Sequence, residues 1–242
     1  MTLASSKPLQ AVFHSVTQDW SDEAIADRVL YLPRSTDAEF TKLCKTVLSH
    51  EESWQADRFI TDDDRSQFIQ RRAFRKYCAA LAGRSDVELS TITFDETENG
   101  APWLANQPDI RFSFSSCRSG FVGAWSRTRA VGIDIQDLST EVEAAELAVS
   151  FFTAAEARIV RKDVPLIKQR FLQLWCLKEA ALKSIGEGLP FGLDSFEFEI
   201  DEGFRMVRVP PLYKDPTQFK SQLFERAGAY LAVVTMKVQT AM

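Results

Sequence analysis

The sequence predicts an α+β fold made of two similar lobes. Helical patterns come first and strand patterns follow, and the same order repeats in the second half of the chain. Of the 242 residues, 45% are hydrophobic, including 18 Phe and 5 Trp, which is enough for a sizeable apolar core. We place the boundary so that residues 1–128 form the N-terminal lobe and residues 129–242 form the C-terminal lobe.

The N-terminal lobe is expected to begin with a short strand at 11–16. Thr36 and Glu39 match the Ser/Thr-x-x-Glu capping box, which predicts that a helix begins there. A long helix is expected from about residue 62 to 82, because apolar residues recur every four positions and a glycine follows. The apolar stripe of this helix consists of Ile69, Ala73, Tyr77 and Leu81.

Short segments rich in β-branched or aromatic residues dominate the middle of the chain. We expect strands at 91–94, 111–115, 121–125 and 131–136. Turns are expected between them at 98–100 and 118–120, because each contains a glycine among polar residues.

The C-terminal lobe repeats the helical pattern and then the strand pattern. Thr153 and Glu156 form a second capping box. A second long helix is expected from about residue 165 to 185, because proline suits a first helical turn and Gly186 follows the last turn. Strands are expected at 196–200, where apolar and acidic residues alternate, and at 230–234.

Composition excludes several classes of function. The net charge of −5 argues against a nucleic-acid binder, which usually has a basic surplus. The beginning of the chain lacks the apolar run of a signal peptide, and no stretch is long enough to span a bilayer, so we expect a cytoplasmic protein. The four cysteines form no Cys-x-x-Cys pair, and with only two histidines the chemistry must rely on carboxylates, lysines, hydroxyls or an oxygen-bound metal.

Two segments carry candidate chemistry. Asp134 and Gln136 lie two residues apart in an expected strand, so both face the same side and together offer oxygens to a cation such as Mg²⁺. The alternative is an aspartate at a strand end that hydrogen-bonds to nearby backbone. Glu179 and Lys183 are four residues apart and share a helix face with Trp175, which suits a cleft wall; the alternative is an exposed salt bridge.

A basic cluster lies in the first long helix. It contains Arg71, Arg72, Arg75 and Lys76. Such a cluster is compatible with a bound phosphate, and the alternative is a solvated helix face.

These segments resemble the paired signature of the 4′-phosphopantetheinyl transferases of the surfactin-synthetase-activating type. Residues 131–134 and 175–183 match the two halves of that signature. Further matches follow in family order at 99–103, 112–116, 151–156 and 186–189. The resemblance covers roughly residues 51–200 and implies a monomer with two similar α+β lobes, which binds coenzyme A in the cleft between them.

The resemblance also implies a mechanism. Asp134 and Glu179 would hold Mg²⁺ against the pyrophosphate of coenzyme A, with Gln136 as a third candidate ligand. Glu179, or a water that it orients, would take the proton from a serine of an apo acyl, peptidyl or aryl carrier protein. Lys183 would stabilise charge on the departing adenosine 3′,5′-bisphosphate, and Lys178 would support the site. Trp175 is expected to pack the helix rather than touch substrate.

The resemblance assigns further contacts to coenzyme A and also exposes departures. The implied binding residues are Arg72, Gly100, Ala101, Pro102, Ser115 and Ser116, together with Asp134, Glu179 and Lys183. The family often has glutamate where this chain has Gln136, so we expect weaker metal binding. Ala101 stands at a family lysine, Ser116 at a family histidine and Gln55 at another basic position, which leaves open how the 3′-phosphate is bound.

Three hypotheses follow for function. The first is an active transferase. The second is a degenerate member that binds coenzyme A or a carrier protein without catalysis, and the third is an unrelated α+β binding protein. Retention of Asp134, Glu179 and Lys183 favours the first, because a protein that only binds does not need the base.

Overall fold

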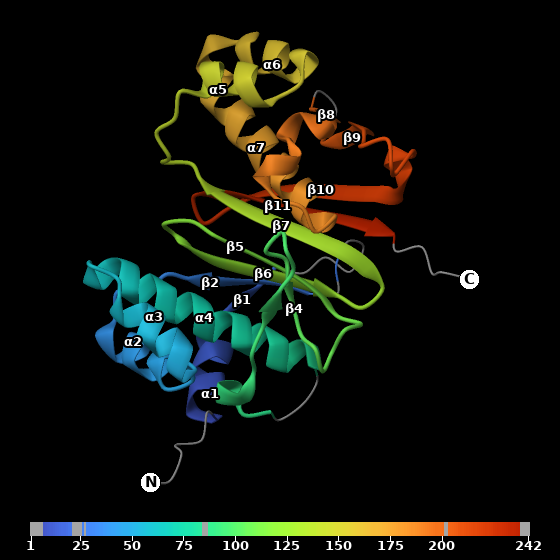
Figure 1. The fold of residues 1–242 in the computed structure, drawn as a ribbon. Helices are drawn as coiled ribbons and strands as arrows, with labels where there is room; N and C mark the ends of the chain where they lie inside the picture. The colour runs from blue at the N-terminus through green and yellow to red at the C-terminus, as the bar shows by residue number, and fades with distance from the viewer. Residues whose placement is uncertain (1–6, 21–25, 27, 84–86, 201–202, 238–242) are drawn as a thin grey trace.

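The computed structural model describes residues 7–20, 26, 28–83, 87–200 and 203–237, and it shows two α+β lobes stacked on each other (Figure 1). The four-stranded N-terminal sheet has the order β1 (Gln18–Asp19), β2 (Arg28–Pro33), β6 (Gly120–Ser126), β5 (Arg111–Ser116). The three-stranded C-terminal sheet has the order β10 (Phe219–Arg226), β11 (Ala229–Lys237), β7 (Arg129–Asp137). Two hairpins join β3 (Asp95–Glu96) to β4 (Pro102–Trp103) and β8 (Glu197–Glu199) to β9 (Arg205–Arg208).

The helices lie around these sheets. The α-helices are α1 (Lys7–Val16), α2 (Ala38–Lys45), α3 (His50–Asp57), α4 (Asp62–Gly83), α5 (Ala144–Phe151), α6 (Ala154–Arg161) and α7 (Ile167–Ser184). Short 3₁₀ turns are η1 (Leu89–Thr91), η2 (Val164–Leu166), η3 (Leu189–Phe191), η4 (Leu193–Ser195) and η5 (Pro216–Gln218). Among the residues that the structure describes, no helix is both long and apolar enough to cross a membrane.

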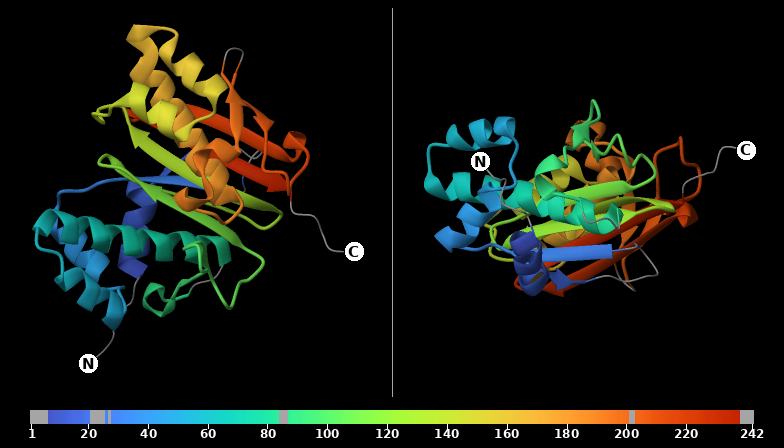
Figure 2. Two further views of the ribbon diagram at one scale, coloured as in Figure 1. Left: turned by 45° about the horizontal axis from the view of Figure 1, so that its top comes forward. Right: turned by 90° about the horizontal axis from the view of Figure 1, so that it is seen from below.

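The two lobes repeat one topology. In each, a first strand is followed by a long helix and then by an antiparallel pair of strands: β2, α4, β5 and β6 in one lobe, β7, α7, β10 and β11 in the other. In each sheet the last strand lies between the other two, in the orders β2-β6-β5 and β7-β11-β10. The expectation of two similar α+β lobes is therefore confirmed, and Figure 2 shows α4 and α7 in separate halves of the molecule.

The two sheets meet through a shared apolar cluster. Alternate residues of β2 point in opposite directions: Leu30 and Leu32 pack in the cluster that includes α4, whereas Val29 and Tyr31 pack in the shared cluster. The shared cluster draws residues from both lobes, and these include Val122, Ala124, Val131, Ile133, Ile135, Leu231 and Val233. The interface between the lobes is a continuous apolar core, which does not mark where one lobe ends along the chain. The domain boundary at 128/129 therefore stays a prediction.

Most of the expected elements of the N-terminal lobe are present, and three expectations are wrong. Residues 11–16 belong to helix α1 and not to a strand, because Leu9 and Phe13 are four residues apart and both are completely buried. The cap of α2 is Asp37, whose side chain accepts a hydrogen bond from the Glu39 amide at 2.8 Å, so Thr36 is not the cap. Residues 91–94 end the turn η1 and lead to β3, which begins only at Asp95.

The second long helix ends as its glycine predicted. Gly186 has a positive φ of 76°, and its amide donates to the Lys183 carbonyl at 3.1 Å. The next amide, that of Glu187, donates to the Leu182 carbonyl at 3.0 Å, which completes a Schellman motif. The Thr153–Glu156 capping box is also confirmed. The last turn of α7 lies beside β7, the strand that carries Asp134.

Candidate functional site

The candidate site is centred on Asp134, in the middle of β7. Its side chain is almost completely buried, with 2% of the residue exposed. One carboxylate oxygen accepts hydrogen bonds from Lys183 Nζ at 2.6 Å and from Ser115 Oγ at 2.7 Å. The other accepts one from the Gln136 amide at 2.8 Å. A buried carboxylate needs such partners, and here they come from both lobes, because Ser115 lies on β5 and Lys183 on α7.

Glu179 completes the cluster from the preceding turn of α7. Its carboxylate lies 3.7 Å from Lys183 Nζ, so the ammonium group stands between two carboxylates. The Glu179 side chain is 15% exposed and that of Lys183 is 27% exposed, against 3% for Asp134. The cluster is therefore open to solvent on the Glu179 and Lys183 side and closed on the Asp134 side.

Gly132 allows β7 and α7 to approach closely enough to form this cluster. A methyl group at residue 132 would overlap the carbonyl oxygen of Ala180 and the amide nitrogen of Ser184, both in the backbone of α7. Cys176 adds a second contact between these elements, because its thiol donates to the carbonyl of Asp134 at 3.2 Å. Strand β7 and helix α7 are thus held together by the close approach at Gly132 and by the Cys176 hydrogen bond.

We expect Gly132→Ala to destabilise the protein and to separate Asp134 from Lys183. Overpacking against backbone costs about 1–3 kcal/mol or more, and this corresponds to a fall in melting temperature of roughly 2–12 °C for a chain of this size. Gly188→Ala is the matched control, because its nearest neighbour would be Pro190 Cδ at 3.7 Å. Equal melting temperatures for the two variants would contradict the close approach.

Burial and neighbouring charges together raise the pKa of both α7 side chains, Glu179 and Lys183. Burial, together with the charge of Asp134, raises the pKa of Glu179, and Lys183 opposes this only in part. Burial also disfavours the charge of Lys183, but Asp134 and Glu179 outweigh it, so the pKa of Lys183 is raised. Lys183 is therefore kept as a cation, while Glu179 binds a proton more readily than an ordinary glutamate.

Lys178 lies on the opposite face of α7 and is completely buried. Its ammonium group is 2.7 Å from Glu156 and donates to the carbonyls of Leu193 at 2.9 Å and Phe196 at 2.6 Å. A group so enclosed has no exposed atom with which to touch a substrate, and the expectation that Lys178 supports the site stays a prediction. The position of Lys178 on α7, one residue before Glu179, is consistent with a role in supporting the site.

The remaining predicted residues lie around the cluster rather than in it. Trp175 contacts the rings of Phe151, Phe152 and Phe171, which confirms that it packs the helix. Ser116 is exposed and follows Ser115 at the end of β5.

The turn containing Gly100, Ala101 and Pro102 reaches the C-terminal lobe through its neighbour Asn99. The Asn99 amide donates to Glu187, just beyond α7, at 3.0 Å. Arg72 lies on α4 with its guanidinium group 5.2 Å from the centre of the Phe68 ring, so it has no contact with the cluster.

The cluster suits a hard cation bound together with a phosphate ligand. Among the described residues, no three histidine, cysteine or carboxylate side chains form a group that would hold a metal by themselves. Asp134 and Glu179 nevertheless converge from different elements, and Lys183 shows that a positive charge is stable between them. Mg²⁺ commonly takes one or two carboxylates and completes its shell with substrate phosphates and water. The donor set therefore fits such an ion.

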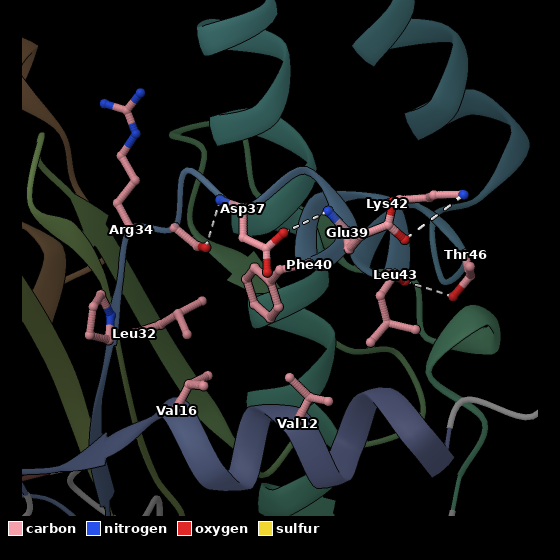
Figure 3. Close-up of a pocket in the computed structure, with 12 residues that line it drawn as sticks. Val12, Val16, Leu32, Arg34, Asp37, Glu39, Phe40, Lys42, Leu43 and Thr46 are labelled. Atoms are coloured by element: carbon pink, nitrogen blue, oxygen red, sulfur yellow. Dashed lines mark hydrogen bonds and ion pairs between the residues drawn. The ribbon is translucent and has the colours of Figure 1, made fainter.

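A separate cavity lies on the N-terminal lobe between α1, β2 and α2 (Figure 3). It has a volume of about 800 Å³, and its apolar walls are Val12, Val16, Leu32, Phe40 and Leu43. Its polar groups serve local structure: Asp37 caps α2, and Lys42 is 4.0 Å from Glu39. None of the predicted site residues lines this cavity.

Sequence reasoning missed three features of this site. Gly132 and Cys176 hold β7 against α7, and Ser113 Oγ accepts a hydrogen bond from the Ile133 amide at 3.0 Å between the lobes. Gly132 lies in segment 131–136, which sequence analysis singled out for Asp134. No pattern in the neighbouring residues indicates that Gly132 lies against the backbone of α7. Ser113 and Ser115 gave a signal, because they alternate with Phe112 and Phe114 along β5 and so share a face.

Comparison with known proteins shows which family this chain resembles. A sequence model of the 4′-phosphopantetheinyl transferase superfamily matches residues 130–234, which include the β7 and α7 site residues. The chain is 25% identical over 174 residues to 4′-phosphopantetheinyl transferase Sfp of Bacillus subtilis, covering 72% of this chain and 75% of that protein. It is 30% identical over 147 residues to 4′-phosphopantetheinyl transferase HetI of Nostoc sp., covering 59% and 61%.

A eukaryotic relative is also similar. The chain is 26% identical over 192 residues to the L-aminoadipate-semialdehyde dehydrogenase-phosphopantetheinyl transferase of Xenopus laevis, covering 73% of this chain and 61% of that protein. The match thus spans about three quarters of the length of the first of these relatives and about three fifths of the length of the other two.

Proposed function

We propose that the chain is a member of the 4′-phosphopantetheinyl transferase superfamily and that it moves the phosphopantetheine arm of coenzyme A to a serine of a carrier protein. The observation that carries the proposal is the cluster in which Lys183 lies between Asp134 and Glu179. The cluster supplies a base, a cation and a buried carboxylate, and it is open to solvent on one side. These are groups that phosphoryl transfer to a hydroxyl requires.

The reaction exchanges a phosphoanhydride bond of the pyrophosphate for a phosphoester bond to serine. The oxygen of the carrier serine forms a bond to the phosphorus on the pantetheine side of the pyrophosphate. The bond from that phosphorus to the bridging oxygen breaks, and adenosine 3′,5′-bisphosphate departs with the electron pair. The serine proton passes to Glu179, directly or through a water.

Glu179 is the proposed base. Its carboxylate is the more exposed of the two in the cluster, and its pKa is raised by burial and by Asp134, which makes it a better proton acceptor than an ordinary glutamate. Asp134, by contrast, is enclosed and accepts three hydrogen bonds. The two carboxylates therefore divide the work, one holding charge in place and the other exchanging a proton.

Lys183 is proposed to stabilise the leaving group. Its pKa is raised by the two carboxylates, so its charge is present throughout the neutral range. Its ammonium group also donates to Ser115 Oγ at 3.2 Å, which fixes its direction. An oriented cation of this kind stabilises negative charge that develops on a departing phosphate.

Magnesium is proposed as the cofactor, held by Asp134 and Glu179 with Gln136 beside them. When bound, it neutralises charge on the transferred phosphoryl group and the leaving group. Gln136 now donates its amide to Asp134 at 2.8 Å, which leaves its oxygen free to turn towards a ligand. The residues around the ion thus supply two negative charges and one neutral amide.

We expect Gln136→Glu to lower the Mg²⁺ concentration needed for half-maximal activity, by on the order of tenfold. Glutamate would place a third carboxylate beside Asp134, and their mutual repulsion is relieved by a divalent cation. Titration of activity with Mg²⁺ at fixed coenzyme A measures the change. An unchanged or raised requirement would mean that residue 136 does not face the ion.

One experiment tests the function as a whole. The protein is incubated with coenzyme A, Mg²⁺ and several purified apo carrier proteins, and each carrier is weighed by mass spectrometry. Gain of the phosphopantetheine mass on the carrier serine is expected. No gain on any carrier would favour the alternative of a protein that binds coenzyme A or a carrier without catalysis.

Three finer features belong to this proposal. We propose a monomer, because both lobes that frame the cluster come from one chain. A cytoplasmic location agrees with four cysteines that are all free. The carrier is proposed to be of the acyl, peptidyl or aryl type, and neither nucleic acid nor membrane is needed for the reaction.

A further inference from the structure

A side-chain hydrogen bond connects the two lobes beside the Asp134 cluster. The Asn99 amide, in the turn of the β3–β4 hairpin, donates to the Glu187 carboxylate at 3.0 Å, although the two residues are 88 positions apart in the chain. Figure 1 shows the hairpin extending from the N-terminal lobe towards the C-terminal end of α7. We call the contact between Asn99 and Glu187 the clasp.

The hairpin presents Asn99 on a turn that has its own hydrogen bonds. The Thr97 amide donates to the Ala101 carbonyl at 3.0 Å, and the Gly100 amide donates to the Thr97 carbonyl at 2.8 Å. The Ala101 amide also donates to Thr97 Oγ1 at 3.1 Å. Gly100 has a φ of 79°, a left-handed conformation that glycine adopts readily. The backbone of the turn therefore fixes the place from which Asn99 reaches the other lobe.

Outside this turn the hairpin is weakly held. Each of its strands has two residues, and among the described residues these strands pair only with each other. Asp95 and Glu96 are exposed, and Trp103 is 40% exposed. An isolated two-stranded hairpin is at best marginally stable in water. A single contact at the tip can therefore decide where the tip lies.

Glu187 has a fixed position on the other side of the clasp. Its amide donates to the Leu182 carbonyl at 3.0 Å, in the Schellman motif that ends α7. Lys183, the residue after Leu182, places its ammonium group 2.6 Å from Asp134. The end of α7 thus holds both the partner of Asn99 and a member of the cluster, so the clasp fixes the hairpin tip relative to the cluster.

We propose that Asn99 and Glu187 are positioning residues, which hold the β3–β4 hairpin beside the Asp134 cluster before coenzyme A binds. This inference rests on the proposed function, because the same hairpin carries the coenzyme contacts implied at Gly100, Ala101 and Pro102. A binding segment that is already ordered does not lose affinity to its own ordering when the ligand arrives. The two residues act in this way without touching the substrate themselves.

Glu187→Ala distinguishes positioning from charge, because the two effects have opposite signs. Removal of a negative charge close to an anionic coenzyme would by itself strengthen coenzyme binding. Loss of the clasp should instead raise the KM for coenzyme A by about 2- to 10-fold, the equivalent of one net hydrogen bond. The kcat should change by less than about twofold, because Glu179 and Lys183 are untouched. A KM that is unchanged or lower would overturn the inference.

Asn99→Asp, alone and with a partner substitution, tests the hydrogen bond itself. It faces Glu187 with a second carboxylate, and the repulsion should raise the KM at least as much as Glu187→Ala does. Addition of Glu187→Gln restores the bond, because the glutamine amide can donate to the new carboxylate. The double variant also has the net charge of the wild type. Its KM should return to within about twofold of the wild-type value, and a KM that stays raised would contradict the clasp.

Glu98→Ala is the matched control. Glu98 is exposed in the same turn, next to Asn99, so its removal deletes one negative charge and leaves the clasp in place. The KM for coenzyme A should stay the same or fall. An equal rise in Glu98→Ala and Glu187→Ala would mean that the turn responds to any substitution, and the clasp would have no special role.

A glutamate-specific protease reports on the hairpin without coenzyme A. Cleavage after Glu96 or Glu98 requires the hairpin to open, and its rate follows the open population when opening is fast. Glu187→Ala leaves the hairpin sequence intact, yet it should raise this cleavage by about 2- to 10-fold, again the equivalent of one hydrogen bond. Glu146→Ala, on α5, should leave the cleavage unchanged.

The outcomes separate this inference from the proposed function. If wild-type protein modifies carriers while Glu187→Ala changes neither the cleavage nor the KM, the clasp is overturned and the transferase assignment stands. If Glu187→Ala raises the cleavage and weakens equilibrium binding of coenzyme A while wild-type protein modifies no carrier, the clasp stands and the transferase assignment is wrong.

Discussion

Glu179→Gln should lower the rate of phosphopantetheine transfer by about three orders of magnitude, within the range of about 10²–10⁴ for loss of a general base. Glutamine has nearly the same shape but accepts no proton, and it is a weaker ligand for Mg²⁺ than a carboxylate. The fold should be preserved, because the one ion pair of the Glu179 carboxylate among the described residues is with Lys183, at 3.7 Å, and the side chain is partly exposed. Single-turnover transfer to an apo carrier, followed by mass spectrometry, measures the loss.

A surface glutamate provides the comparison for this result. Glu146 is exposed on α5 in the same lobe, so Glu146→Gln removes an equal charge away from the cluster. It should leave the rate within about twofold, as surface substitutions usually do. Retention of more than a tenth of the wild-type rate by Glu179→Gln would show that another group takes the serine proton.

Local sequence signals were sufficient for the elements that depend on local physics. The long helices α4 and α7 were predicted, because their apolar spacing and terminal glycines act within a few turns. Strands β5, β6, β7 and β11 were predicted within one or two residues at each end, apart from the longer C-terminal end of β11. The pairing of Glu179 with Lys183 also followed from sequence, because residues four apart on a helix must be neighbours.

Features that depend on tertiary contacts were not predicted. The strand expected at 11–16 is a helix, because Leu9 and Phe13 are anchored in the core of the N-terminal lobe. Spacing along the chain does not reveal that Gly132 touches the backbone of α7 or that Ser115 reaches Asp134. The resemblance to a family brought Asp134 and Glu179 together before their distance was visible, which periodicity alone cannot do.

The basic cluster of α4 shows why a charged helix face needs its surroundings before it can be interpreted. From sequence alone, Arg71, Arg72 and Arg75 are compatible with either a solvated surface or a phosphate site. The buried Nε atoms of Arg72 and Arg75, which have no hydrogen-bond partner, are a property of the folded chain that the sequence does not reveal. The same reasoning applies to Lys178, whose neighbour in sequence faces the site while it faces the core.

Lys178→Met should lower the free energy of unfolding by about 3–5 kcal/mol, the cost of leaving one partner of a buried ion pair alone. Glu156 is completely buried and would keep its hydrogen bonds from the amides of Thr153 at 3.0 Å and Phe198 at 2.9 Å. It would lose its only countercharge among the described residues, which is Lys178 at 2.7 Å. Urea unfolding followed by circular dichroism measures the change.

The surface of the same helix offers a matched control. Lys168 on α7 lies 3.4 Å from Glu141, and their side chains are 40% and 94% exposed. Lys168→Met should therefore change the free energy of unfolding by less than about 1 kcal/mol. The double variant Glu156→Gln/Lys178→Met should be more stable than Lys178→Met alone, because no unpaired charge remains buried. If the double variant is no more stable, packing of the lysine chain rather than its charge supports the helix that carries Glu179.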